Sequence, residues 1–161
     1  MAPGDREAVK DAGAAVRPGI RRPTQERSRR RFEAILDAAD RLLERTDPLD
    51  FSIYALAPEA GMSAQAIYHF FRSPALVLMA LADRYMASFL ALMDPPLPPG
   101  LATWQQVEGY QFERARQFFE ARAPARKLLL GAAYSSEFRS RDLNHDVLLA
   151  EKGLALLQQR F

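Results

Sequence analysis

Helical spacing dominates the pattern of apolar and polar residues along the chain. Between residues 25 and 45 the large apolar side chains recur every three or four residues, and together they form one amphipathic stripe: Phe32, Ile35, Leu36, Ala39, Leu42 and Leu43. Thr24 is a candidate N-cap for this helix, and Arg45 suits its last turn. No stretch shows the alternation typical of a β-strand, so the pattern predicts an all-α protein.

Two short helices follow a polar break that contains a proline. Ser52 is placed to cap the first, Gly61 to end it in the left-handed conformation, and Ser63 to cap the second. The short turn between them, residues 60–63, has the length and the glycine of a helix-turn-helix. Spacing alone does not separate this motif from an ordinary pair of helices in a bundle.

The second half of the chain is helical as well. Ser73 and Pro74 open a helix that reaches about Met93 and is apolar nearly all round, which predicts burial between other elements. After a proline-rich break, further helices are predicted at about 103–122, 123–134 and 141–161. We therefore divide the chain into a disordered arginine-rich arm (1–23), a three-helix helix-turn-helix head (24–73) and a C-terminal helical regulatory domain (74–161).

Composition limits the chemistry that the chain can perform. The 161 residues include no cysteine, which excludes disulfides and thiolate metal sites. The two histidines are too few for an ordinary histidine-based metal site. We find no signal peptide and no apolar run long enough to span a bilayer, so we expect a cytoplasmic protein without a membrane partner. The net charge is only +2, but seven arginines fall between Arg17 and Arg31. Such a block suits binding to a polyanion, and it equally suits a solvated tail that aids solubility.

Enzyme motifs are missing from the sequence. It contains no Gly-x-Ser-x-Gly, no phosphate-binding glycine loop and no His-Glu-x-x-His. His145 stands between Asn144 and Asp146, but a histidine in this setting on a helix is far more often a surface or capping residue. We expect no enzyme activity, no catalytic or metal-binding residues and no cofactor.

A series of short motifs runs without gaps through residues 27–81. The motifs are Arg27-Ser28, Ile35-Leu36-Asp37-Ala38-Ala39, Ser52-Ile53, Leu56-Ala57, Ala60-Gly61-Met62-Ser63, Ala66-Ile67-Tyr68-His69-Phe70-Phe71 and Ser73. In this order and spacing they resemble the head of the tetracycline-repressor (TetR) family. The resemblance covers about a third of the chain, and the rest is similar only in being helical.

This resemblance implies a homodimeric regulator, usually a repressor, whose head binds a palindromic operator in double-stranded DNA. It further implies a small ligand in the C-terminal domain and a fourth helix that transmits ligand occupancy to the head. A recognition helix at about 64–71 would enter the major groove. There Gln65 is the evident base reader, through a bidentate pair with adenine, and an exposed helix residue without a role is the plain alternative. The residues predicted to contact DNA are Arg21, Arg22, Arg27, Arg30, Ser52, Tyr54, Ser63, Ala64, Gln65, Ala66, Tyr68 and His69.

The chain departs from the family pattern in ways that bear on DNA binding. Pro74 stands where the family commonly has a lysine, Pro58 should kink or shorten the supporting helix, and residues 52–71 contain no lysine or arginine. Phosphate neutralisation would then fall on the arm and on Arg72. The chain stops where family members usually continue with two more helices, which predicts a short member, a truncated product or another mode of dimerisation.

The second half offers a candidate site for a small apolar effector. Its aromatic and methionine side chains would line a pocket, or they would simply pack the helical core. The candidates are Met86, Phe89, Met93, Trp104, Tyr110, Phe118 and Tyr134. The leading hypothesis is thus a ligand-responsive, DNA-binding transcriptional repressor. The alternative is a helical small-ligand-binding or protein-interaction module with a vestigial DNA-binding head.

Overall fold

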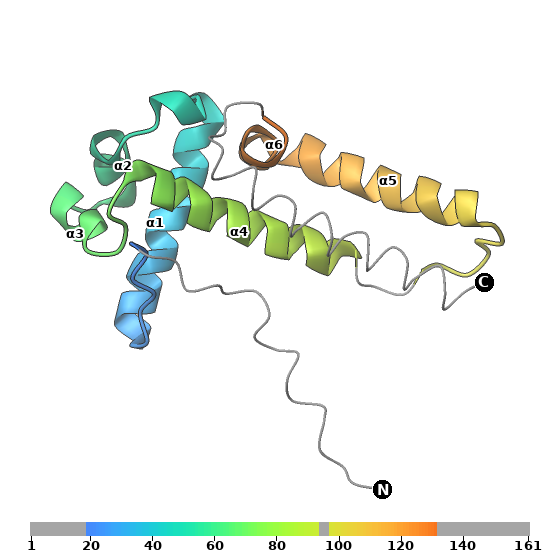
Figure 1. Ribbon diagram of the computed structural model, residues 1–161, viewed down its shortest axis with the longest axis horizontal. Helices are drawn as coiled ribbons and strands as arrows, with labels where there is room; N and C mark the ends of the chain where they lie inside the picture. Colours follow the sequence, from blue (N-terminus) through green and yellow to red (C-terminus); the bar gives the residue numbers. More distant parts are fainter. Residues whose placement is uncertain (1–18, 94–96, 132–161) are drawn as a thin grey trace, which may run out of the picture.

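The computed structural model describes residues 19–93 and 97–131, and helices make up the regular elements of these ranges (Figure 1). The elements are α1 (Glu26–Arg45), the 3₁₀-helix η1 (Pro48–Asp50), α2 (Ile53–Ala60), α3 (Ala64–Tyr68), α4 (Pro74–Met93), α5 (Trp104–Ala121) and α6 (Ala123–Leu129). The described residues form no strand, only an isolated bridge between Ile20 and Phe71. The all-α prediction is therefore confirmed, whereas the helix predicted at 141–161 lies outside the described residues.

The elements are arranged around α1. Helices α2 and α3 lie to one side of it, α4 crosses it, and α6 packs against both α1 and α4 (Figure 1). Helix α5 returns beside α4 and leads into α6. The head and the helical domain that follows it are thus joined through α1 and α4.

Three serines cap helices as the sequence predicted. Each accepts a hydrogen bond at Oγ from the backbone N–H three residues later, which satisfies a donor that the helix cannot. The caps are Ser52 for α2, Ser63 for α3 and Ser73 for α4, with N···O distances of 3.2, 3.2 and 3.4 Å. Gly61 ends α2 with a φ of 62°, also as predicted.

Two helix ends in the head differ from the prediction, and α6 ends at Leu129 although a helix was predicted to about residue 134. Thr24 does not cap α1, which begins at Glu26 and whose N-cap residue makes no side-chain hydrogen bond. Helix α3 ends at Tyr68 rather than near residue 71, because the two phenylalanines that follow both direct their N–H groups to the Ile67 carbonyl. By contrast, α2 runs past Pro58 to its predicted end, so the proline does not shorten it.

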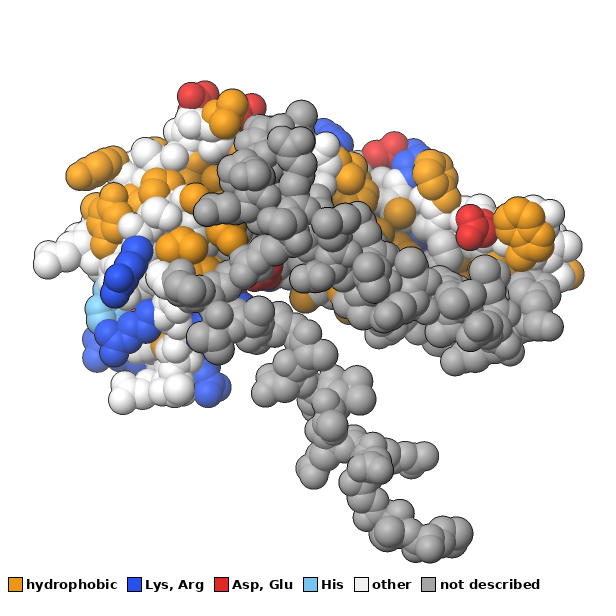
Figure 2. Space-filling model, viewed as in Figure 1, with side chains coloured by type: hydrophobic (Ala, Val, Ile, Leu, Met, Phe, Trp, Pro, Cys, Tyr) orange, Lys and Arg blue, Asp and Glu red, His pale blue; other side chains and the backbone are white. Residues whose placement is uncertain are grey.

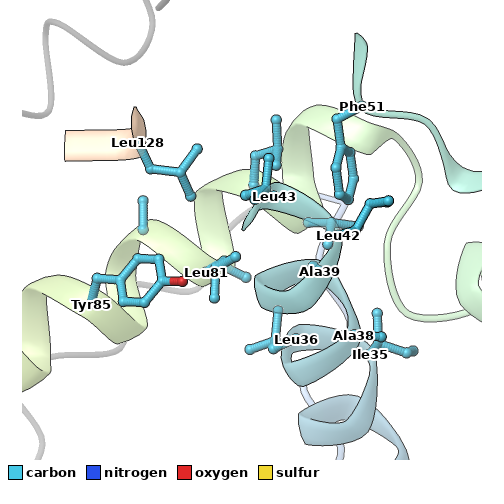
Figure 3. Packing of buried hydrophobic residues seen from close by; sticks show 14 of the residues in the cluster. Ile35, Leu36, Ala38, Ala39, Leu42, Leu43, Phe51, Leu81, Tyr85 and Leu128 are labelled. Carbon is cyan, nitrogen blue, oxygen red and sulfur yellow. The ribbon is translucent and has the colours of Figure 1, made fainter. Parts of the chain in front are cut away.

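The apolar stripe of α1 forms the centre of the core. Ile35 and Leu43 are fully buried, and Phe32 stacks on Phe71 with ring centroids 4.8 Å apart. Figure 3 shows Leu43 of α1 on the side of Leu81 of α4 and Leu128 of α6, whereas Leu42 lies toward Phe51. One continuous cluster of buried side chains therefore holds the head and the helical domain together.

Polar contacts fix the position of α4 along α1. Arg84 Nη1 donates to Asp37 at 2.6 Å and lies 3.6 Å from Glu33, and the Tyr85 hydroxyl donates to Asp40. Burial and the Asp40 carboxylate raise the pKa of Tyr85 far above its usual range, so its hydroxyl remains a neutral donor. Half-exposed ion pairs add little free energy, but they specify which residues of the two helices face each other.

Lys127 of α6 caps the C-terminal end of α1. Its Nζ donates to the carbonyl oxygens of Leu43 at 2.6 Å and Thr46 at 3.0 Å, and it lies 3.4 Å from that of Glu44. The last carbonyls of a helix lack intrahelical partners and carry partial negative charge, which a half-buried ammonium group stabilises. This contact ties α6 directly to the first helix of the head.

Helix α4 is less enclosed than the sequence predicted. Val77 and Leu81 are fully buried, but Ala87 and Ala91 are exposed. By length and composition alone α4 is apolar enough to cross a membrane, which corrects the expectation that the chain has no such run. Its contacts with α1, α5 and α6, together with the paired Arg84 in its middle, are those of a core helix.

Glu59 joins α2 to α1 through two arginines. Arg41 Nε donates to its Oε1 at 3.0 Å, and Arg45 Nη2 donates to its Oε2. The hydrogen bond from Arg45, and to a smaller extent that from Arg41, holds the pKa of Glu59 below its ordinary value. The carboxylate thus stabilises the supporting helix against α1 while it is ionised.

Replacing Ile35 by alanine should lower the free energy of unfolding by about 2–5 kcal/mol, because a fully buried side chain leaves a cavity in the core. Leu49→Ala removes a side chain that is 76% exposed and should cost less than about 0.5 kcal/mol. Urea denaturation followed by circular dichroism measures both. Equal losses in the two variants would contradict the core assignment.

Glu59→Gln should lower the melting temperature at neutral pH, and the difference should vanish in acid. Because the folded pKa lies below the unfolded value of 4.5, the stabilisation is complete above that value and is lost as the pH falls through the folded pKa. Melting temperatures across a pH series test this. Glu44→Gln, whose carboxylate has no ion pair in the described part of the chain, is the control. A deficit of Glu59→Gln that stays constant with pH would contradict the prediction.

Candidate nucleic-acid interface

The turn between α2 and α3 gives the head its helix-turn-helix geometry. The N–H of Gly61 bonds to the Pro58 carbonyl at 3.2 Å, and that of Met62 to the Ala57 carbonyl at 3.0 Å, so the end of α2 is satisfied within the turn. Leu56 of α2 and Ile67 of α3 are both fully buried beneath it. The angle between the two helices is therefore held by hydrogen bonds and by packing.

The outer surface of α3 carries no charge. Gln65, Tyr68 and His69 are exposed, Tyr68 to 40%, whereas Ala64 and Ala66 are half-buried. Small residues between exposed polar ones let a helix come close to another surface. The predicted base reader Gln65 and the predicted backbone contacts Tyr68 and His69 therefore lie exposed along α3 and at its end, as a recognition helix requires.

The first turn of α2 adds two of the predicted contact residues. Ser52 Oγ accepts the Ala55 N–H and keeps its own hydrogen available to donate. The Tyr54 side chain is 77% exposed, so its hydroxyl is available as well. Both are neutral donors of the kind that bind phosphate oxygens.

Residues 19–22, which the sequence assigned to a disordered arm, lie against the head. The Arg21 N–H bonds to the Phe70 carbonyl at 2.9 Å, and the Arg72 N–H bonds to the Gly19 carbonyl at 3.2 Å. We call this docked segment, residues 19–22, the strap. The rest of the predicted arm, residues 1–18, lies outside the described residues.

The arginines of the strap and of α1 differ in whether their side chains are paired within the head. Arg21 Nη1 lies 3.2 Å from His69 Nε2, which places its guanidinium beside the end of α3. Arg22 lies 4.0 Å from Asp83, and Arg30 is paired with Glu26 at 3.0 Å, so both are partly neutralised.

Four further arginines in or next to the head have no carboxylate partner among the described residues: Arg27, Arg29, Arg31 and Arg72. The list of contact residues drawn from the sequence included Arg27 and missed Arg31. Figure 2 shows basic side chains gathered with a histidine at the end of the molecule where α3 lies. The positive charge that α2 and α3 lack is therefore supplied by neighbouring elements.

The candidate effector residues differ in burial, and they do not all lie together. Met86, Phe89, Met93 and Phe118 are buried, and the Phe89 and Phe118 rings are 5.3 Å apart. Tyr110 is half-buried beneath the Arg114 guanidinium, 5.4 Å from its ring centre. Trp104 does not join this group, since it is 55% exposed, and Tyr134 lies outside the described residues. No group of side chains able to hold a metal occurs in the described ranges.

Comparison with known proteins agrees with this geometry. A family model described as bacterial regulatory proteins, tetR family, matches residues 35–75, from the middle of α1 into α4. A protein of Xanthobacter autotrophicus, an uncharacterized HTH-type transcriptional regulator in the dhlA 5′ region, is 39% identical over 70 residues. That region is 42% of this chain and 35% of the relative, so the chain matches about a third of the relative's length.

The helix-turn-helix head therefore matches the tetR family of bacterial regulatory proteins over residues 35–75, and the resemblance that its motifs indicated is confirmed for this region.

Gly19→Ala should release the strap. Gly19 has a φ of 91°, which strains an alanine there, and an added Cβ would lie 2.7 Å from Leu76 Cδ1 and displace that side chain. A left-handed alanine costs about 1–2 kcal/mol, and trypsin should therefore cleave after Arg21 roughly tenfold faster. Mass spectrometry of the digest measures the rate. Gly100→Ala, at a φ of 97° with open space around it, is the control; equal cleavage in the two variants would show that the strap is not docked.

Proposed function

We propose that this chain is a ligand-responsive, DNA-binding transcriptional repressor that acts in the cytoplasm as a homodimer on a palindromic operator. One observation carries the proposal: a tetR-type head exposes an uncharged α3 beside arginines that have no carboxylate partner. Helix α3 would enter the major groove, and the basic side chains around it would bind the backbone on either side.

Gln65 is the residue that would read a base. It lies in the first turn of α3 and is exposed, and a glutamine amide pairs bidentately with the N6 and N7 positions of adenine. Ala64 and Ala66 on either side are small enough to let the helix approach the bases. The remaining predicted residues of α2 and α3 (Ser52, Tyr54, Ser63, Tyr68 and His69) would hold phosphates and fix the register.

The helices behind the head offer a route for effector control. Met86, Phe89 and Met93 of α4 lie with Phe118 of α5 in one apolar region that a small apolar effector would enter. Any shift of α4 or α6 reaches α1, because Arg84 and Lys127 hold it at separate points. An effector that binds one arrangement more tightly than the other would thereby change the affinity for DNA.

A helical ligand-binding or protein-interaction module with a vestigial head is the competing function. Pro74 at the start of α4 and the lack of any basic residue between Ser52 and Phe71 favour it. The exposed α3 and the unpaired arginines near it favour DNA binding instead. If DNA left the melting temperature unchanged while a small apolar ligand raised it, the module would be the correct assignment.

Selection of bound sequences from random double-stranded DNA tests the proposed function. A recovered palindrome would support both base reading and dimerisation, because a dimer places two recognition helices about one turn of DNA apart. Recovery of no preferred sequence at low salt would overturn the proposal.

Gln65→Ala should relax the preference for adenine at one position of each half-site and weaken binding of the selected sequence by about tenfold, since a bidentate pair contributes roughly 1–3 kcal/mol. Its affinity for unrelated DNA should stay the same. Fluorescence anisotropy with both duplexes measures this difference. Gln105→Ala, an exposed glutamine on α5, is the matched control. Equal weakening on both duplexes would remove Gln65 from base reading.

A further inference from the structure

A notch lies beside α3, between the first turns of α1 and the turn that leads into α3. It encloses about 450 Å³. Ser28 and Arg31 line it from α1, Ser63 from the turn, and His69 from the end of α3, and no aspartate or glutamate is among its lining residues. Elements far apart in the sequence thus meet at one concave surface next to the recognition helix.

Each polar group of this notch has a hydrogen to donate. Arg31 has no carboxylate partner among the described residues, and the Ser28 hydroxyl makes no hydrogen bond to any of them. Ser63 Oγ accepts the N–H of Ala66, which leaves its hydroxyl hydrogen free. Arg21 can only donate, so a hydrogen bond from its Nη1 to His69 Nε2, 3.2 Å away, requires the tautomer with its proton on Nδ1. A cation, two hydroxyls and an imidazole ring therefore line one concave surface that no carboxylate lines.

We propose that this notch binds a phosphate of the DNA backbone, with Arg31 as the charged partner. The inference rests on the proposed function, since the phosphate belongs to the duplex that α3 would enter. Residues 52–71 contain no lysine or arginine, and Pro74 opens α4, so the helix-turn-helix itself offers no cation to the backbone. Arg31 supplies one from α1, and Ser28, Ser63 and His69 add the neutral donors that fix the orientation of a phosphate.

Arg31→Gln in the full chain tests this assignment. The probe is a fluorescent duplex of about 30 base pairs of mixed sequence, because backbone contacts do not depend on sequence. The variant should bind roughly tenfold more weakly at low salt, and the slope of log K against log[salt] should fall in magnitude by about 0.9, the value for one phosphate contact. Ser28→Ala should weaken binding less and leave the slope unchanged, because a hydroxyl neutralises no charge.

Arg29→Gln is the matched control. It removes the same charge from the same helix, and Arg29 likewise has no carboxylate partner in the described residues but does not line the notch. Melting temperatures of all variants should equal that of the parent, since these side chains are exposed or half-exposed. An equal loss of affinity and slope in Arg29→Gln would assign the effect to net charge and overturn the notch.

The remaining outcomes separate this inference from the proposed function. A parent chain that binds no duplex at low salt would overturn both. A parent that binds DNA while Arg31→Gln binds with the same affinity and slope would overturn the notch alone. Free phosphate is the other source of the same chemistry: if inorganic phosphate raised the melting temperature of the parent but not of Arg31→Gln, and the slope for DNA stayed the same, the notch would bind free phosphate and the backbone assignment would be wrong.

Discussion

The packing of α1 is the constraint on which the described structure depends. Its buried stripe contacts α2 on one side and α4 and α6 on the other, and two fully buried alanines, Ala38 and Ala39, let those helices approach closely. Phe32 continues the stripe to Phe71, at the point where α3 gives way to α4. Because one helix supports both halves, the orientation of α3 and the arrangement of the helical domain are not independent of each other.

Under the proposed function, this arrangement separates base reading from charge. Helix α3 is exposed and uncharged, and the cations near it come from the strap and from α1. Charge placed off the recognition helix binds phosphates without competing for the base edges, which carry the sequence information. A short neutral helix flanked by arginines on other elements is thus a physically reasonable surface for the proposed DNA binding, although Pro74 and not a cation opens α4.

Helix α1 also connects the head to the rest of the chain. Arg84 and Tyr85 of α4 bind acidic residues along α1, and Lys127 of α6 binds the carbonyls at its end. Each contact contributes little free energy by itself. Their importance lies in their position, because they hold α1 at two separate points along its length. Contacts at two separate points resist movement of α1 relative to α4 and α6, and the effector control proposed above would depend on this coupling.

The sequence by itself determined the helical class, the serine caps, the left-handed Gly61 and the helix-turn-helix motif. These features depend on hydrogen bonds within a single helical turn, where the partners are neighbours in the chain. Tertiary structure alone decided that residues 19–22 dock on Phe70 to Arg72, that Arg22 is partly neutralised by Asp83, and that Arg31 rather than Arg30 lies free beside α3. The physical reason is that the partner of a surface arginine is set by the folded path, which brings together side chains about fifty residues apart, and no local pattern encodes that distance.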